Sequence, residues 1–188
     1  MAQPSSKIIS PEEYFYSEET SDVKNEYFHG EIFAMTGASL AHNIIASNTI
    51  IELGMALQGS ECTVFTSDMK VEIDPAHHYT YPDISVVCGG IKLIPNRNDV
   101  ITNPVVIIEI LSQSTMDYDR GSKFTAYRNI DTLRDYILIN QYKYHVEYFS
   151  KNDSNAKWHL NEYKQKEDTI NIQSIDTRLT LKQIYNKI

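Results

Sequence analysis

Two acidic residues stand at stretches of sequence that are otherwise apolar. Asp83 directly precedes the run ISVVC at positions 84–88, and Glu109 lies inside the run VVIIEIL at positions 105–111. A carboxylate in such a strand is costly to desolvate unless it is paired, protonated or bound to a metal ion. Two carboxylates on neighbouring strands form a site for a hard divalent cation such as Mg²⁺ or Mn²⁺. The pair therefore predicts metal-assisted cleavage of a phosphodiester.

Each acid also has a simpler structural interpretation. For Glu109 the alternative is a buried ion pair with an Arg or Lys of the core, although an acid surrounded by apolar residues is more often functional. Asp83 follows Pro82, and an Asp in that position is a common turn residue. The functional hypothesis depends on the pairing, because the start of one strand and the late part of another can meet at one end of a sheet.

Lys123 supplies a third charge. On a helix predicted over 119–129, the spacing places Arg120, Lys123 and Tyr127 on one face. The simpler interpretation is a solvated helix face with Tyr127 packed on the sheet. Because this helix follows the Glu109 strand directly, its first turn can lie over the carboxylates.

Other candidate chemistries are weak. Taken singly, His42 and Asn43 on a predicted helix are more typical of structure than of catalysis. His77 and His78 fall in a polar segment without the spacing of a zinc site. The sequence has no GxSxG elbow, no GxxxxGK[ST] or GxGxxG phosphate loop and no zinc-deaminase pattern.

Length and composition indicate an ordinary soluble globular protein. The 188 residues, 41% hydrophobic and 22% charged, fit one domain over 10–188 preceded by a frayed arm over 1–9. No apolar run is long enough for a membrane span, and the first residues lack a secretion signal, so we expect a cytoplasmic protein without a membrane partner. The net charge of −8 argues against a protein that coats nucleic acid, but not against a nuclease with a local site.

The two cysteines, Cys62 and Cys88, lie in strand-like segments without CxxC spacing. We interpret them as buried thiols in a reducing compartment, and not as a disulfide or a zinc site.

The expected elements alternate between helices and strands. Ser10, Pro11 and Glu13 form a helix start, and a hairpin turns at Gly30. A long helix covers 39–57, where Leu40, Ile44, Ile51 and Met55 recur at helical spacing and Gly59 ends it. The expected strands are 62–66, 69–73, 84–88, 105–111, 136–139, 144–149, 157–163 and 169–172, with a long polar loop over 89–104 and a short last helix capped by Thr180 and Gln183. This order predicts an α/β or α+β domain with a mixed central sheet, in which 105–111 is a central strand.

Several of these stretches together resemble the Uma-type family of restriction-endonuclease-like proteins, within the PD-(D/E)xK nuclease superfamily. The resemblance covers almost the whole chain after the first several residues. The stretches that carry it are His29-Gly30-Glu31, Met35 to Ala38 with His42, Tyr81 to Cys88, Pro104 to Ser112, Thr115 to Arg128, Tyr136 to Ile139 and Leu179 to Tyr185.

The resemblance implies a restriction-endonuclease-like core, with a mixed sheet flanked by helices, an N-terminal hairpin and a metal site at one edge. It makes Asp83 the motif Asp, Glu109 the motif acid and Glu31 an accessory acid. Two positions depart from the pattern. Leu111 stands where the superfamily has its lysine, so Lys123 on the next helix is the matching residue, and Gln113 stands where relatives commonly have Pro.

The resemblance and the residues together imply an endonuclease that cleaves DNA through a water activated by Mg²⁺ or Mn²⁺. Asp83 and Glu109 would bind the ion with help from the backbone carbonyl of Ile110, and Lys123 would orient the water. Arg120 and Arg128 are candidate phosphate contacts, with surface solubility as an equal alternative. Two other functions stay open: a non-catalytic nucleic-acid or protein adaptor that keeps the fold, and a hydrolase of small phosphodiesters. The C-terminal aromatic residues could form a homodimer interface, although the favoured interpretation is that they cover the far side of the sheet in their own chain.

Overall fold

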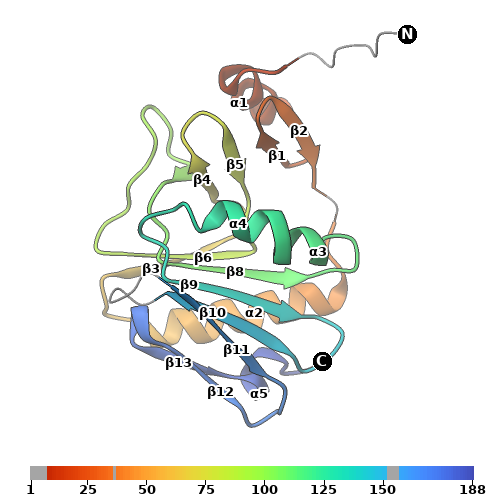
Figure 1. The fold of residues 1–188 in the computed structure, drawn as a ribbon, viewed down its shortest axis with the longest axis vertical. Helices are drawn as coiled ribbons and strands as arrows, with labels where there is room; N and C mark the ends of the chain where they lie inside the picture. Colours follow the sequence, from red (N-terminus) through yellow and green to blue (C-terminus); the bar gives the residue numbers. More distant parts are fainter. Residues whose placement is uncertain (1–7, 36, 152–156) are drawn as a thin grey trace.

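A six-stranded mixed sheet forms the middle of the molecule, seen in Figure 1 with helices on both of its faces. The computed structural model describes residues 8–35, 37–151 and 157–188. In spatial order the strands are β11 (Trp158–Tyr163), β10 (Val146–Lys151), β9 (Asp135–Asn140), β8 (Val106–Leu111), β6 (Ile84–Cys88) and β3 (Cys62–Thr66). The predicted mixed central sheet is confirmed.

Strands β8 and β9 lie at the centre of this sheet because both are apolar on both faces. Every residue of each strand is buried. They run parallel, and β6 pairs antiparallel with β8 on its other side. A parallel pair requires a crossover, which the helical segment between the two strands provides. Glu109 is therefore held in the best-covered strand of the fold.

A second, five-stranded sheet packs against the helical crossover. Its strands in order are β2 (Glu31–Ala34), β1 (Asn25–Phe28), β5 (His78–Thr80), β4 (Lys70–Asp74) and β7 (Val100–Ile101). A two-stranded sheet of β12 (Thr169–Ile172) and β13 (Thr177–Thr180) completes the strands, with the short 3-10 turn η2 (Gln173–Ile175) between them. We did not expect β5, β7, β13 or η2, because each is too short to show a periodic pattern.

The predicted N-terminal elements are confirmed. Ser10 caps α1 (Pro11–Thr20) in a capping box with Glu13. The hairpin β1–β2 turns at His29 and Gly30, whose φ angles of 47° and 90° are those of a two-residue type I′ turn. Within the segment 1–9, expected to be a frayed arm, Ile9 donates its N–H to the Gly30 carbonyl and packs against the buried cluster that contains Tyr14, and residues 1–7 lie outside the described residues.

Helix α2 (Leu40–Ala56) is confirmed with Ser39 as its N-cap, but the face that it buries differs from the predicted row. The residues packed into the core are Ile45, Thr49 and Leu53. Leu40, Ile51 and Met55 are exposed. The helix carries apolar residues around most of its circumference, so periodicity predicts a helix but does not decide which face is buried.

The predicted helix over 119–129 is three consecutive segments: α3 (Met116–Tyr118), the π-helical turn η1 (Asp119–Lys123) and α4 (Phe124–Tyr127). π turns occur mostly as single turns inside α-helices and often lie at functional sites. The widened turn places the Lys123 ammonium 5.7 Å from the centre of the Tyr118 ring, although residues five apart diverge on a regular α-helix. The last helix, α5 (Leu181–Ile184), has the expected capping box of Thr180 and Gln183.

The prediction of free thiols is wrong, because Cys62 and Cys88 form a disulfide. They stand directly opposite each other on the antiparallel strands β3 and β6, with their Cα atoms 4.0 Å apart. Only the strand register, which the sequence does not show, brings them together.

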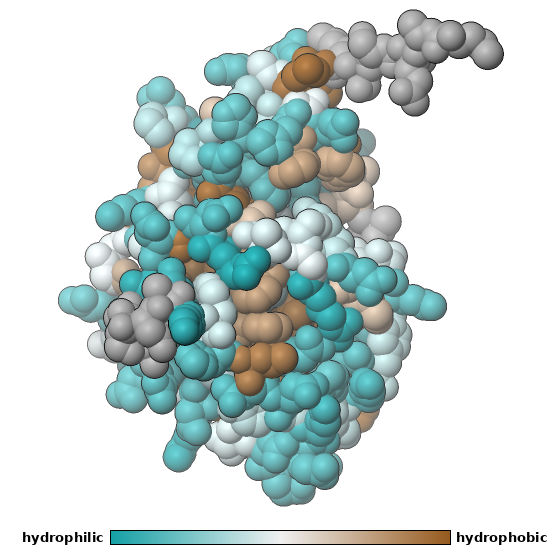
Figure 2. All heavy atoms as spheres, in the orientation of Figure 1, coloured by the Kyte–Doolittle hydropathy of each residue, from teal (hydrophilic) through white to brown (hydrophobic). Residues whose placement is uncertain are grey.

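The C-terminal aromatic residues mostly pack within their own chain. Phe149 and Trp158 contact Phe124, and Tyr144 contacts Tyr185. The surface shown in Figure 2 is mainly hydrophilic, with small apolar areas between polar residues. Within the described part of the chain, no helix has both the length and the apolar character needed to cross a bilayer. The possible homodimer stays a prediction.

Candidate metal centre

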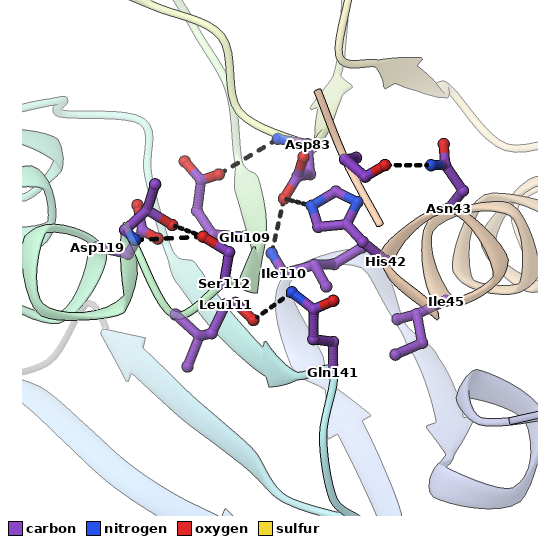
Figure 3. A network of polar contacts seen from close by, with 12 residues as sticks. His42, Asn43, Ile45, Asp83, Glu109, Ile110, Leu111, Ser112, Asp119 and Gln141 are labelled. Atoms are coloured by element: carbon purple, nitrogen blue, oxygen red, sulfur yellow. Dashed lines mark hydrogen bonds and ion pairs between the residues drawn. The ribbon is translucent and has the colours of Figure 1, made fainter. Parts of the chain in front are cut away.

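The candidate centre lies where β6 and β8 separate. Their backbone pairing ends at Ile84 opposite Ile108. At the next residues, side-chain carboxylates take the place of backbone carbonyls as hydrogen-bond acceptors between the two strands. The Asp83 N–H donates to Glu109 Oε2 at 3.3 Å, and the Ile110 N–H donates to Asp83 Oδ2 at 2.7 Å. Each carboxylate thus caps the neighbouring strand, which explains why two acids are stable beside an apolar core (Figure 3).

Lys123 places its ammonium against these acids from the helical crossover. Its Nζ lies 2.9 Å from Glu109 Oε1 and 3.8 Å from Asp119 Oδ1. Tyr127, one turn further along, donates its hydroxyl to the same Glu109 oxygen at 2.9 Å. The structure therefore brings Asp83, Glu109 and Lys123 together as the sequence predicts. It also contains a buried ion pair between Glu109 and Lys123, which is the simpler interpretation of Glu109. Charge pairing alone therefore does not distinguish a functional acid from a structural one.

The predicted accessory acid is replaced by another residue of the same hairpin. Glu31 is exposed at the start of β2, and within the described part of the chain it forms no hydrogen bond or ion pair with the centre. Glu26 on β1 takes that place, with Oε1 3.1 Å from Lys123 Nζ. It also accepts hydrogen bonds from the Thr80 hydroxyl and, at 3.3 Å, from the Tyr81 N–H. Sequence reasoning missed Glu26 because its orientation depends on β5, which was not predicted.

The protonation of the cluster follows from burial and from its excess of negative charge. Burial raises the pKa of Glu109 to about 8, Lys123 opposes this rise, and Asp119 and Asp83 add to it. Burial lowers the pKa of Lys123, but Glu109 and the other acids outweigh it and hold the pKa well above its usual value. For Glu26, burial raises the pKa, yet Lys123 and Thr80 hold it below the ordinary range. The two acids that contact Lys123 thus differ, because the pKa of Glu109 is raised and the pKa of Glu26 is lowered.

His78 is a further buried group near these charges. We placed it in a polar loop, but it lies on β5 with 4% of its surface exposed, and its Nε2 has no hydrogen-bond partner among the described residues. Burial lowers its pKa to about 4; Glu26 opposes this effect and Lys123 adds to it. The imidazole is therefore neutral at pH 7.

The two candidate phosphate contacts differ. Arg120 forms a two-pronged ion pair with Glu147, with Nη2 and Nε at 2.6 and 2.9 Å from Oε1, so its guanidinium is already engaged. Arg128 is exposed, lies over the Phe124 ring and donates to Thr125. Of the two, Arg128 is the more exposed, while the Arg120 side chain is 32% exposed and paired with Glu147.

The donor set suits a hydrated Mg²⁺ ion better than a metal held entirely by protein. Within the described ranges, no three or more His, Cys, Asp or Glu side chains are arranged to hold a metal. Mg²⁺ usually keeps several waters and needs only one or two carboxylates. Asp83 fits this requirement, because among the described residues both polar contacts of its side chain are to Oδ2, which leaves Oδ1 for an ion. The Ile110 carbonyl as a ligand stays a prediction.

Two curated relatives match most of the chain. The chain is 36% identical over 177 residues to Uncharacterized protein slr1290 of Synechocystis sp. (strain ATCC 27184 / PCC 6803 / Kazusa), which covers 94% of this chain and 91% of the relative. Uncharacterized protein sll1609 of the same organism is 35% identical over 162 residues, covering 86% and 91%.

A solved structure shares the fold. It is described as a putative nuclease belonging to DUF820 from Anabaena variabilis ATCC 29413, and it superposes with a TM-score of 0.72 at 17% identity, covering 88% of this chain and 91% of that one. Residues 11–182 match the model of the Uma2 family, described as putative restriction endonuclease. The chain therefore belongs to the Uma2 family and has the fold of a nuclease.

Proposed function

We propose that this protein is a metal-dependent nuclease that hydrolyses phosphodiester bonds of DNA, with Mg²⁺ or Mn²⁺ held by Asp83 and Glu109. The observation that carries the proposal is the Lys123 ammonium, 2.9 Å from Glu109 at the point where β6 and β8 separate. The family description supports a nuclease in general terms. The bound ion would lower the pKa of a water molecule and offset charge on the phosphate.

Lys123 has two tasks in this proposal. Its ammonium is a compact point charge that can orient the attacking water and stabilise negative charge developing on the phosphate. Glu26 and Tyr127 support it, since Glu26 pairs with the ammonium and the Tyr127 hydroxyl fixes the Glu109 oxygen that Lys123 contacts. Both contacts come from rigid elements, so the reacting groups are held before substrate arrives.

A hydrolase of small phosphodiesters is the second candidate function. The observation that favours it is the ion pair between Arg120 and Glu147, which removes one of the two expected phosphate contacts. The net charge of −8 acts in the same direction, because it opposes the approach of a long polyanion. Arg128 then remains as the candidate contact for a DNA backbone.

The test is cleavage by purified wild type and three variants, Asp83→Asn, Glu109→Gln and Lys123→Gln. We expect Mg²⁺- or Mn²⁺-dependent nicking of supercoiled plasmid that each variant reduces by at least about 100-fold, because each removes a group acting on the reacting atoms. Glu162→Gln is the matched control, since Glu162 is a surface acid paired with Lys164 and His145. A short oligonucleotide and a small diester in parallel reactions separate the two candidate functions. Metal-independent cleavage, or equal cleavage by wild type and all variants, would reject both.

Direct binding of Mn²⁺ separates either enzyme from a non-catalytic adaptor. Isothermal titration should show binding that Asp83→Asn and Glu109→Gln weaken strongly. A folded protein that binds DNA but no Mn²⁺ would instead establish the adaptor.

A further inference from the structure

His42 makes a contact with Asp83 that the proposed function does not use. Its Nε2 lies 3.1 Å from Asp83 Oδ2, and their side chains are 13% and 17% exposed. Figure 3 shows the imidazole reaching from the first turn of α2 towards the carboxylate that opens β6. The same oxygen accepts the Ile110 N–H. Asp83 Oδ2 is thus held from two sides.

The first turn of α2 is itself fixed to the other acid-bearing strand. The Ser39 hydroxyl caps the helix by accepting the His42 N–H at 3.1 Å, and it also donates to Gln141 Oε1. Gln141 Nε2 in turn donates to the Leu111 carbonyl at 2.9 Å, two residues after Glu109. One helical turn therefore contacts the ends of both β6 and β8, where their own pairing has stopped.

We infer that His42 is a positioning residue that orients Asp83 for metal binding, an inference that depends on the proposed function. His42 and the Ile110 N–H both engage Oδ2, which leaves Oδ1 for an ion. The partners that orient a ligating carboxylate strengthen metal binding, and their loss typically weakens affinity or activity by about 10–100-fold. His42 touches neither the proposed water nor the phosphate in this arrangement.

The test compares Mn²⁺ affinity among His42 variants by isothermal titration. We expect His42→Leu to weaken binding by about 10–100-fold. His42→Gln should stay within about threefold of wild type, because its amide nitrogen can donate from the position of Nε2. Asn43→Ala is the matched control: Asn43 lies in the same turn and donates to the Ser39 carbonyl at 2.8 Å, and not to Asp83. It should leave the affinity within about twofold.

The dependence of the cleavage rate on Mn²⁺ concentration provides a second measurement. For His42→Leu, saturating Mn²⁺ should restore most of kcat while the metal concentration for half-maximal rate rises with the loss of affinity. Thermal unfolding of each variant shows that the fold is kept. If wild type and His42→Leu bind Mn²⁺ equally, the inference is overturned and the proposed function stands. If wild type binds no Mn²⁺, both fail. If His42→Gln is as weak as His42→Leu, the hydrogen bond is not the cause and the inference also fails.

Discussion

At the scale of residues, the centre is a group of acids arranged around one buried cation. Lys123 contacts Glu109, Glu26 and Asp119, and all of these side chains are at least 88% buried. Replacing Lys123 would leave three buried acids without their cation, whereas replacing one acid would relieve part of the excess negative charge, so substitutions here change stability as well as any activity. For this reason, a loss of activity in a variant has meaning only beside a measurement of unfolding.

His78 gives a pH dependence of stability that can be measured. Burial lowers its pKa to about 4, against an ordinary value of 6.5, so below pH 6.5 the unfolded chain takes up a proton that the folded protein resists. Neutral His78 therefore contributes at most about 3 kcal/mol to the free energy of unfolding. This contribution is present above pH 6.5 and is lost as the pH falls towards 4. The free energy of unfolding, measured in urea, should fall more steeply over this pH range for wild type than for His78→Phe, whose side chain cannot titrate. Parallel curves for the two proteins would contradict the prediction.

Sequence reasoning identified part of this centre and missed the rest for physical reasons. Glu109 stands out because a charge inside an apolar run has few structural explanations, and Asp83 becomes a candidate through its pairing with Glu109. The arrangement with Lys123 followed from the order of strand and helix. Glu26 and His78 could not be found in the same way, since their orientation depends on the pairing of β1 with β5, two strands far apart in the sequence.

At the scale of elements, a glycine-to-alanine substitution should have opposite effects on stability in the hairpin β1–β2 and in the crossover helix. Gly30 has φ of 90°, and an added Cβ would lie 2.5 Å from Ile8 Cγ2. Gly121 in η1 has open space around it. We expect Gly30→Ala to lower the free energy of unfolding by about 1–2 kcal/mol and Gly121→Ala to raise it by about 0.5–1 kcal/mol.

The two glycine variants also differ in their expected effect on cleavage. Gly30→Ala should reduce activity as well, because β1 carries Glu26 to Lys123. Gly121→Ala should leave it unchanged. Urea unfolding and plasmid nicking check both statements, and stabilisation by Gly30→Ala would contradict the assignment of the turn.

The elements show where periodicity is informative and where it is not. The strands 84–88 and 105–111 were predicted to within a residue, because their apolar runs end at turn residues. The long helix was predicted with its cap, Ser39, but not with its buried face. Burial of Thr49 while Ile51 is exposed reflects the shape of the sheet beneath the helix, which the sequence of the helix alone does not contain.

At the scale of the whole molecule, the disulfide joins the edge strand β3 to β6 across 26 residues of sequence. A loop of this length predicts a stabilisation of about 3 kcal/mol through the unfolded chain. Reduction should lower the free energy of unfolding by that amount without abolishing cleavage at moderate temperature, because Cys88 is the last residue of β6 and Asp83 directly precedes its first residue.

Alkylation followed by mass measurement checks the bridge, and urea unfolding with and without dithiothreitol checks its effect. A double variant, Cys62→Ala with Cys88→Ala, is the control and should not respond to the reductant. Two free thiols in protein purified under air would contradict the pairing.

Because Leu111 stands where a lysine would share the strand of Glu109, the proposed active site depends on a separate helix to supply its ammonium. A lysine two residues after the acid shares its strand, and the strand alone sets their separation. Here the ammonium comes from a residue 14 positions later (123 − 109), on a separate helix. Local geometry no longer guarantees that the two charges meet. If the crossover unfolded locally while the sheet stayed folded, Lys123 would separate from Glu109. Most spectroscopic probes would still report a native protein, but the proposed activity would be lost.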